Sequence, residues 1–190
     1  AVRRAAALAG LQVERILNEP TAAALAYAYG RHLKQRVLVY DLGGGTFDAS
    51  VLELQDNIYE VISTGGDNFL GGVDFDARIT DSLLQRFERE AGARLGGDRV
   101  ALSRLADAAE RAKCALSECT SIPLQLPYLA LHDDLPVSLE AVLTREELEA
   151  LVEPLVDRSI DACRDVLLAH GLTAADIDEV ILVGGQSRMP

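Results

Sequence analysis

Two aspartates flank a turn of three glycines in the segment Val37–Leu54, and these residue types can bind a phosphate and a metal ion. An apolar run ends in Asp41, Gly43–Gly45 turn the chain, and Thr46 and Asp48 begin a second run with the alternation of a strand. Glycine lets backbone N–H groups approach a ligand closely, and clustered N–H groups in a turn bind anions. Carboxylates beside a phosphate suit the hydration shell of Mg²⁺. The segment therefore predicts a phosphate site, rather than a hairpin that merely turns on glycine.

Two common phosphate-binding motifs do not fit this segment. A P-loop requires a lysine after its last glycine and opens a helix, and no lysine follows these glycines. A dinucleotide-binding fingerprint also leads into a helix, whereas the pattern from Thr46 to Leu54 favours a strand. A strand–turn–strand unit that carries acidic residues is instead similar to the phosphate loop of the actin-like ATPases.

Four further segments extend this resemblance along the chain. Together with the string Asp41–Asp48 they resemble, in order and spacing, signature segments of the DnaK-type heat-shock chaperones, the Hsp70 family. The four segments are Asn18–Tyr27, Leu70–Asp76, Glu110–Lys113 with Ser117, and Ile181–Pro190. The matched part looks like the second lobe of the family's nucleotide-binding domain. The resemblance implies an α/β fold: an actin-like ATPase (ribonuclease H-like) lobe with a smaller α/β insert subdomain.

Hydrophobic periodicity and turn residues predict the elements that position these motifs. We expect helices at residues 2–8, 20–29, 74–91, 100–118 and from Thr144 towards His170. A strand pair is expected within 37–54, and further strands at 12–17, 59–63, 121–131, 136–143 and 179–183, the last of a buried type. Residues 65–72 are expected to form a glycine-rich loop. Thr144 and Glu147 form a capping box, and Pro154 is expected to kink the helix that follows. Residues 1–70 and 155–190 are predicted to form the core subdomain, with the phosphate and adenosine loops. Residues 71–154 are predicted to form an inserted upper subdomain.

The resemblance implies roles for the residues around the turn. The backbone amides of Gly43, Gly44 and Gly45 and the Thr46 hydroxyl are expected to face the β- and γ-phosphates of ATP. Asp41 and Asp48 are expected to order the attacking water or the water molecules of Mg²⁺, with Asp41 holding the metal through water. The family also places a carboxylate near the γ-phosphate, which would be Glu19. An alternative role for Glu19 is that of a helix-start acid stabilised by the helix dipole.

A second set of residues is expected to bind the nucleoside of ATP or ADP. At 100° per residue, Glu110, Lys113 and Ser117 share one face of a helix, and the resemblance implies contacts with ribose hydroxyls and an adenine nitrogen. A surface ion pair is the alternative for Glu110 and Lys113. The resemblance implies that Gly184, Gly185 and Arg188 line an adenosine pocket. It also implies that Gly72 closes this pocket from the side of the insert. A tight turn with a solvated arginine is the alternative there.

Two positions depart from the family pattern. Val73 stands where many relatives hold an acid, so a polar contact is lost there. Cys114 stands where some relatives carry arginine, which predicts a looser clamp on adenine.

Charge and cysteine usage limit the partners and the location. The net charge of −12 and a pI near 4.6 argue against a nucleic-acid-binding surface. No apolar stretch reaches membrane-spanning length and the amino end does not have the pattern of a signal peptide. The three cysteines, Cys114, Cys119 and Cys163, lack C-x-x-C spacing, which favours free thiols. We therefore expect a cytoplasmic protein that contacts neither nucleic acid nor membrane.

These features predict a nucleotide-binding fragment of an ATP-dependent molecular chaperone, active in protein folding and the stress response, that couples ATP hydrolysis to binding and release of unfolded polypeptide. The polypeptide would bind through a domain that is absent here. A J-domain co-chaperone is expected near Arg15 and Asn18, and a nucleotide-exchange factor on the insert. The first lobe is also absent, so the isolated chain is expected to be inactive. Alternatives are a degenerate lobe that acts as a nucleotide-sensing or partner-binding scaffold, and another actin-like ATPase or kinase.

Overall fold

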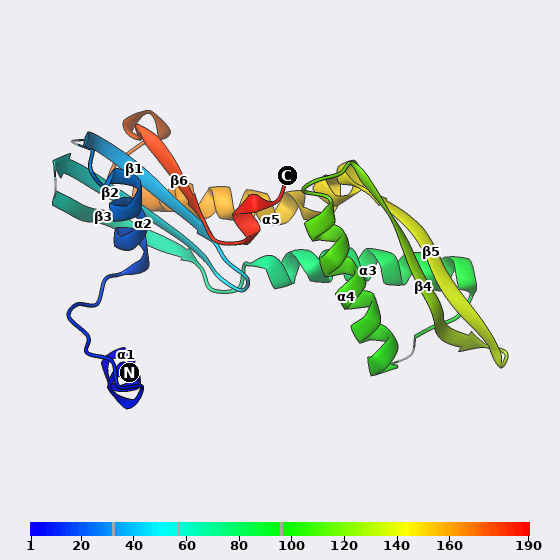
Figure 1. Cartoon of the computed structure of the whole chain (residues 1–190). Coiled ribbons are helices and arrows are strands. Elements are labelled where there is room, and N and C mark those ends of the chain that lie inside the picture. The colour runs from blue at the N-terminus through cyan, green and yellow to red at the C-terminus, as the bar shows by residue number, and fades with distance from the viewer. Residues whose placement is uncertain (32, 57, 96) are drawn as a thin grey trace.

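The computed structural model describes residues 1–31, 33–56, 58–95 and 97–190, and it shows a mixed α/β chain in two parts (Figure 1). The first part is built on a four-stranded sheet of order β3-β2-β1-β6. It contains β1 (Leu33–Leu42), β2 (Phe47–Asp56), β3 (Ile58–Asp67) and β6 (Glu179–Val183) with helix α2 (Glu19–Ala28). The second part contains α3 (Gly72–Ala91), α4 (Arg99–Ala115) and the hairpin of β4 (Ser121–His132) and β5 (Leu135–Thr144). The long helix α5 (Arg145–Leu168) runs between the two parts (Figure 1).

The sheet is mixed because its central strands are joined in two different ways. A short turn joins β1 to β2, and these strands are antiparallel, with Asp41 opposite Asp48. A parallel pair needs a long crossover, and the chain reaches β6 only after the second part of the molecule and α5, so that Asp41 also lies opposite Val183. The ends of β1 and β6 therefore lie side by side at the turn.

Side chains of β1 alternate between two apolar layers, as the period of two in a strand requires. Val37 and Val39 pack with Ala24 and Ala28 of α2. Leu38 belongs to the larger core on the other face, where α5 packs against β2 and β3. Burial on both faces explains why the strand is apolar from Val37 to Val39.

The second part is stabilised by the apolar faces of its helices. The buried residues of α3 recur every four positions, at Phe75, Ile79, Leu83 and Phe87, which places them on one face. They belong to the same core as the buried side chains of α4, the hairpin and α5. Thr144 and Glu147 form the predicted capping box at the start of α5. The predicted subdomain boundary at residues 154 and 155 lies within this helix, which runs through Pro154 without interruption.

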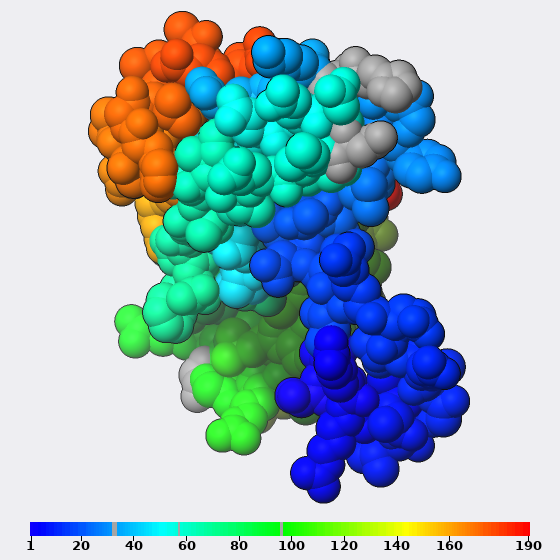
Figure 2. Space-filling model, turned by 90° about the vertical axis from the view of Figure 1, so that its left-hand side faces the viewer, coloured from blue at the N-terminus to red at the C-terminus, as the bar shows by residue number. Residues whose placement is uncertain are grey.

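One predicted strand is wrong. Residues 12–17 have no strand structure, and the segment from Gly10 to Asn18 connects α1 (Val2–Leu8) to α2 without helix or strand structure. Figure 1 and Figure 2 show α1 and this segment, in dark blue, standing off the body of the molecule. The alternation of residue types favours a strand, but a strand also needs a neighbour to accept and donate its hydrogen bonds. Within the part of the chain that the structure describes, this segment has no such neighbour.

Three other differences concern the ends and the burial of elements. The glycine-rich stretch at 65–72 was expected to be a loop, but β3 continues to Asp67 and α3 begins at Gly72, because glycines 65 and 66 pair with β2. Helix α4 ends at Ala115, so Ser117 lies just beyond it. The strand β6 is not buried: Val180 and Leu182 are 48% and 62% exposed, since β6 is an edge strand.

The other predicted helices and strands are present, with ends shifted by a few residues. Two short 3₁₀ turns complete the described elements: η1 (Ala174–Asp176) and η2 (Gln186–Arg188). In the residues described, no helix combines the length and the apolar character needed to cross a bilayer.

Candidate functional site

The glycine turn between β1 and β2 is closed by its own backbone. The N–H of Gly43 donates to the carbonyl of Thr46 at 2.9 Å. This amide is therefore used inside the turn, although the sequence predicted that it would face a phosphate. Gly44, Gly45 and Thr46 are exposed. A Cβ added at Gly44 or Gly45 would meet nothing within 4 Å, so the space around these two residues is open to a ligand.

The first residues of α3 hold the turn from the other side. The N–H of Gly72 donates to the carbonyl of Gly43 at 3.0 Å, and the N–H of Val73 donates to that of Gly44 at 2.9 Å. In a trans peptide the N–H points opposite to the C=O of the same unit, and the chain contains no cis peptide bonds in its described residues. The amides of Gly44 and Gly45 therefore point away from α3.

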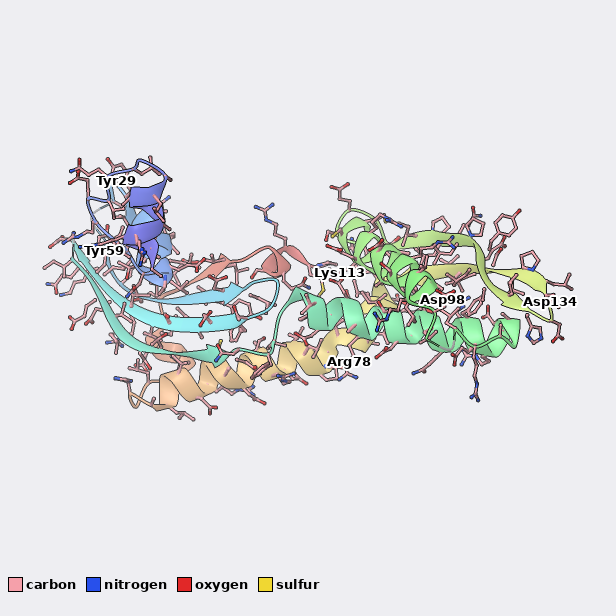
Figure 3. The ribbon with its side chains drawn as sticks, turned by 90° about the horizontal axis from the view of Figure 1, so that it is seen from below. Tyr29, Tyr59, Arg78, Asp98, Lys113 and Asp134 are labelled. Carbon is pink, nitrogen blue, oxygen red and sulfur yellow. The ribbon has the colours of Figure 1, made fainter. Side chains whose placement is uncertain are left out.

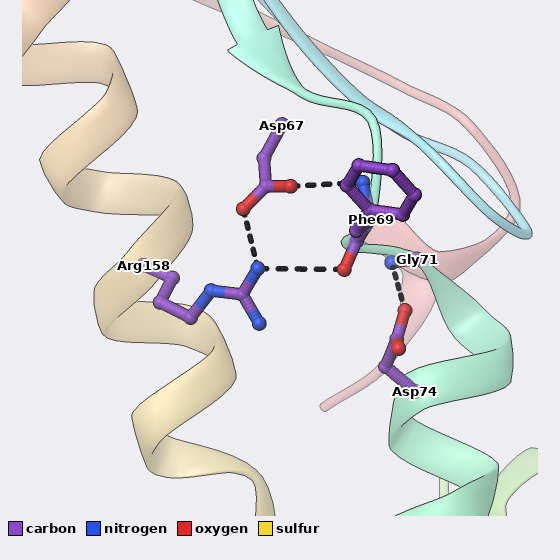
Figure 4. A network of polar contacts seen from close by, with 5 residues as sticks. All are labelled: Asp67, Phe69, Gly71, Asp74 and Arg158. Atoms are coloured by element: carbon purple, nitrogen blue, oxygen red, sulfur yellow. Dashed lines mark hydrogen bonds and ion pairs between the residues drawn. The ribbon is translucent and has the colours of Figure 1, made fainter.

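Close packing makes glycine necessary at Gly71, which precedes α3. A Cβ at this position would lie 2.4 Å from the backbone nitrogen of Gly45. The segment that leads here from β3 is tied down by polar contacts (Figure 4). Arg158 of α5 binds the Asp67 carboxylate and the carbonyl of Phe69, and Asp74 accepts a hydrogen bond from the N–H of Gly71 at 2.8 Å. The pKa of Asp67 is lowered, first by the N–H of Phe69 and then by Arg158.

Three carboxylates gather at the turn. Asp41 and Asp48 are opposite each other across β1 and β2, and Glu19 reaches them from the first turn of α2. The pKa of Asp41 is raised, first by burial, then by the negative charges of Glu19 and Asp48, and by a hydrogen bond with Glu19. Negative charge is therefore concentrated here, which a cation would relieve. Within the described ranges, no three acidic, histidine or cysteine side chains are grouped as direct ligands of one metal ion.

Gly184, at the end of β6, packs directly against the end of β1. Its φ is +88°, and a Cβ would lie 2.1 Å from the carbonyl oxygen of Leu42 and 2.7 Å from Oδ1 of Asp41. Glycine is required both by this backbone conformation and by the contact. Gly184 thus allows the segment after β6 to pass close to Asp41.

A cavity of about 490 Å³ lies beside the turn. It is lined by residues of α3, α4 and the segment after β6, and it reaches the turn at Gly44. The sequence predicted seven of its lining residues as ligands of the nucleotide, namely Gly44, Gly72, Glu110, Lys113, Ser117, Gly185 and Arg188. The other predicted site residues are Glu19, Asp41, Gly43, Gly45, Thr46, Asp48 and Gly184, which belong to the turn, its flanking strands and the chain beside it rather than to the cavity wall.

Lys113 lies between α3 and α4 (Figure 3). Its ammonium is 2.9 Å from Oδ1 of Asp76 and donates a long hydrogen bond, 3.4 Å, to the carbonyl of Gly72. The sequence left open whether Glu110 and Lys113 bind a ligand or form a surface ion pair. A surface ion pair does not describe this geometry, because Lys113 is buried and paired with another acid. Glu110 is exposed at the rim.

Five lining residues complete the cavity, and the sequence reasoning assigned none of them a ligand role: Val73, Asp76, Cys114, Gln186 and Met189. Val73 and Cys114 had been identified only as departures from the family pattern. Gln186 is buried, and its amide donates to the sulfur of Met189 at 3.2 Å. Asp76 and Gln186 lie inside motifs that the sequence matched, but their contacts depend on how distant elements pack.

A family model described as "Hsp70 protein" matches residues 1–190 of the chain. The match covers the glycine turn, the cavity and all the motifs on which the resemblance was based. The mixed sheet and its helices agree with an actin-like ATPase fragment of this family.

Proposed function

Since this chain belongs to the Hsp70 family, we propose that it is the second lobe of the nucleotide-binding domain of an ATP-dependent chaperone, in which hydrolysis drives binding and release of unfolded polypeptide. The family assignment itself supports a chaperone nucleotide-binding region. The coupling to polypeptide and the residues that carry out hydrolysis are our proposal, as is the division into a core (1–70 and 155–190) and an insert (71–154).

One observation carries the proposal most directly. The cavity lined by Lys113, Ser117 and Arg188 opens onto the glycine turn at Gly44. A ligand with an apolar, hydrogen-bonding end and an anionic end would fill both sites at once. A nucleoside diphosphate or triphosphate has this form, with the nucleoside in the cavity and the phosphates over the turn.

At the phosphate end, the proposed work is electrostatic. The amides of Gly44 and Gly45 and the hydroxyl of Thr46 bind phosphate oxygens. Asp41 and Asp48 hold water molecules in the orientation needed for attack on the γ-phosphate or for the shell of a cation. Phosphoryl transfer depends mainly on such positioning and charge stabilisation.

Mg²⁺ is the cation that we propose for the three carboxylates. Burial, and then the negative charges of Glu19 and Asp48, raise the pKa of Asp41, and a divalent cation beside it would favour the ionised form. Asp41 would hold the ion through water, with Asp48 and Glu19 as neighbouring acids. When bound, Mg²⁺ neutralises phosphate charge and fixes the orientation of the phosphates.

At the nucleoside end, Glu110 and Lys113 bind ribose hydroxyls and Ser117 meets an adenine nitrogen. Arg188 is exposed at the cavity wall, where its planar guanidinium can stack on a purine. Gly72 allows Gln186 and Lys113 to approach α3 closely, because a Cβ there would lie 3.0 Å from Oε1 of Gln186 and 3.5 Å from the ammonium of Lys113.

The two lysines of the chain provide a direct test of this function. In the intact nucleotide-binding domain, Lys113→Met should weaken ADP binding by about tenfold or more, since it removes a charged hydrogen-bond donor. Lys34→Met changes an exposed lysine of β1 and should leave the affinity unchanged. Isothermal titration calorimetry measures both. If the parental domain does not bind ADP, the proposed function is wrong; binding without hydrolysis would instead favour a nucleotide-sensing scaffold.

The proposed partners use other surfaces. Arg15 and Asn18 are exposed on the segment before α2, which leaves them accessible to a J-domain. A nucleotide-exchange factor would grip the insert, and unfolded polypeptide would bind elsewhere in the protein. We also propose a cytoplasmic location.

An Arg15→Asp variant should lose stimulation of hydrolysis by a J-domain while keeping its basal rate. Unchanged stimulation would show that Arg15 is not part of the proposed contact.

A further inference from the structure

Asp76 of α3 is the acid that pairs with Lys113 of α4. Oδ1 of Asp76 lies 2.9 Å from the ammonium nitrogen, and the side chains of Asp76 and Lys113 are 20% and 10% exposed. Both residues line the cavity. An ammonium withdrawn this far from water needs a compensating charge, and Asp76 supplies it from the neighbouring helix.

The pair holds the lysine by charge and leaves part of its hydrogen-bonding capacity for a ligand. Oδ1 of Asp76 is buried and, within the described residues, accepts no aligned hydrogen bond. The ammonium also donates to the carbonyl of Gly72, but at 3.4 Å this bond is weak. An ammonium carries three N–H donors, so Lys113 is fixed in place while donors remain for a ligand in the cavity.

The other acids near Lys113 cannot take the place of Asp76. Asp74 already accepts the hydrogen bond of Gly71 at the start of α3, and Val73 carries no charge. Glu110 lies three residues before Lys113 on α4, at a spacing that permits an ion pair on the helix surface. Glu110 is exposed at the rim of the cavity, so a lysine paired with it would move from its buried position towards solvent.

We propose that Asp76 is a positioning residue for the nucleotide, which keeps Lys113 at the cavity wall so that its N–H groups meet the ribose hydroxyls. This inference rests on the proposed function, because it assumes that the cavity holds the nucleoside. In this proposal Asp76 acts through Lys113, because it determines where the lysine side chain that binds the nucleotide lies.

The test compares ADP with 2′,3′-dideoxy-ADP in the intact nucleotide-binding domain, by calorimetry. The parental domain should bind ADP more tightly than the dideoxy analogue. In Asp76→Asn the Kd for ADP should rise about tenfold, while the Kd for the analogue changes little, so that the preference for ADP is lost. Asp76→Glu should restore part of it. Asp81→Asn, an exposed acid of the same helix, is the matched control and should keep both affinities.

A double variant sharpens the result. If Asp76 acts through Lys113, adding Asp76→Asn to Lys113→Met should cost no further affinity for ADP. Equal losses for ADP and the analogue, together with a lower Tm, would show a purely structural role and overturn the proposal. So would an unchanged preference for ADP in Asp76→Asn, although ADP binding by the parental domain would still support the proposed function. A parental domain that binds neither nucleotide would overturn both.

Discussion

The proposed phosphate end of the site and its proposed nucleoside end are made of different groups. At the phosphate end, the backbone of Gly44 and Gly45 and the carboxylates of Asp41 and Asp48 belong to one turn and its flanking strands. At the nucleoside end, side chains meet from α3, α4 and the segment after β6. Backbone amides can bind the anionic group that every nucleotide carries, and they are present whatever the side chain. The side chains of the nucleoside end, in contrast, can be substituted one at a time. The departures from the family pattern, Val73 and Cys114, both lie at the nucleoside end.

The glycines in and around the turn have two different uses. A Cβ added at Gly44 or Gly45 would meet nothing within 4 Å, so the lack of a side chain there leaves space for the proposed ligand. Gly71 and Gly184 are packed against the turn, and their lack of a side chain serves the fold. Substitutions at the first pair should therefore affect binding, and those at the second pair should affect stability.

The largest expected effect separates chemistry from binding. In the intact nucleotide-binding domain, Asp41→Asn or Thr46→Val should lower kcat by about 10²-fold or more, because each change removes a group that acts on charge developing in the transition state. The affinity for ADP should change far less. Steady-state ATPase assays and calorimetry measure the two quantities. Asp107→Asn, an exposed acid of α4, serves as the control, and near-parental kcat in both variants would show that the roles assigned at the turn are wrong.

The next effect tests the two uses of glycine. Gly71→Ala places a methyl group 2.4 Å from the nitrogen of Gly45 and should lower the free energy of unfolding by about 1–3 kcal/mol, as overpacking does. Gly44→Ala, which meets nothing within 4 Å, should change it by less than about 1 kcal/mol. Urea denaturation followed by circular dichroism gives both values. Equal destabilisation by the two variants would refute the distinction.

A smaller effect concerns the thiols. Cys114 is exposed and lines the cavity, so ADP should slow its alkylation. Cys119, partly exposed and outside the lining of this cavity, should be largely unaffected. Cys163 is buried, which raises its pKa to about 11 and should keep its labelling slow with or without ADP. Timed labelling and peptide mass spectrometry distinguish the three. No protection of Cys114 would mean that the nucleoside binds elsewhere, and equal protection of all three would indicate a general tightening of the protein.

The smallest expected effect is on thermal stability, where two substitutions of aspartate by asparagine should change the Tm in opposite directions. The pKa of Asp41 is raised, so its ionisation opposes folding, and Asp41→Asn should raise the Tm at neutral pH. That gain should shrink as the pH falls through the raised pKa towards 3.8, the ordinary value. The pKa of Asp67 is lowered, so Asp67→Asn should lower the Tm at neutral pH, and this loss should disappear as the pH falls below 3.8 through the lowered value. Shifts of the same sign would contradict the pKa directions.

The accuracy of the sequence predictions follows the range of the interactions involved. The glycine turn, the capping box of Thr144 and the helix expected at 74–91 depend on neighbours within a few residues, and they were predicted correctly. The strand expected at 12–17 was wrong because a strand depends on a partner that its own residues do not specify. The exposure of β6 was missed for a related reason: its apolar pattern does not reveal that it lies at an edge of the sheet.

The sequence alone determined that two carboxylates and a glycine turn lie together, because Asp41, the three glycines and Asp48 follow one another within eight residues. It also determined which residues of α4 share a face. Tertiary structure alone decided which charged groups meet across elements. Glu19 reaches Asp41 because α2 packs on the sheet, and Lys113 pairs with Asp76 because α3 packs on α4. Spacing along a helix gives Lys113 a neighbour in Glu110, but only the packing of two helices gives it the buried partner that holds it at the cavity.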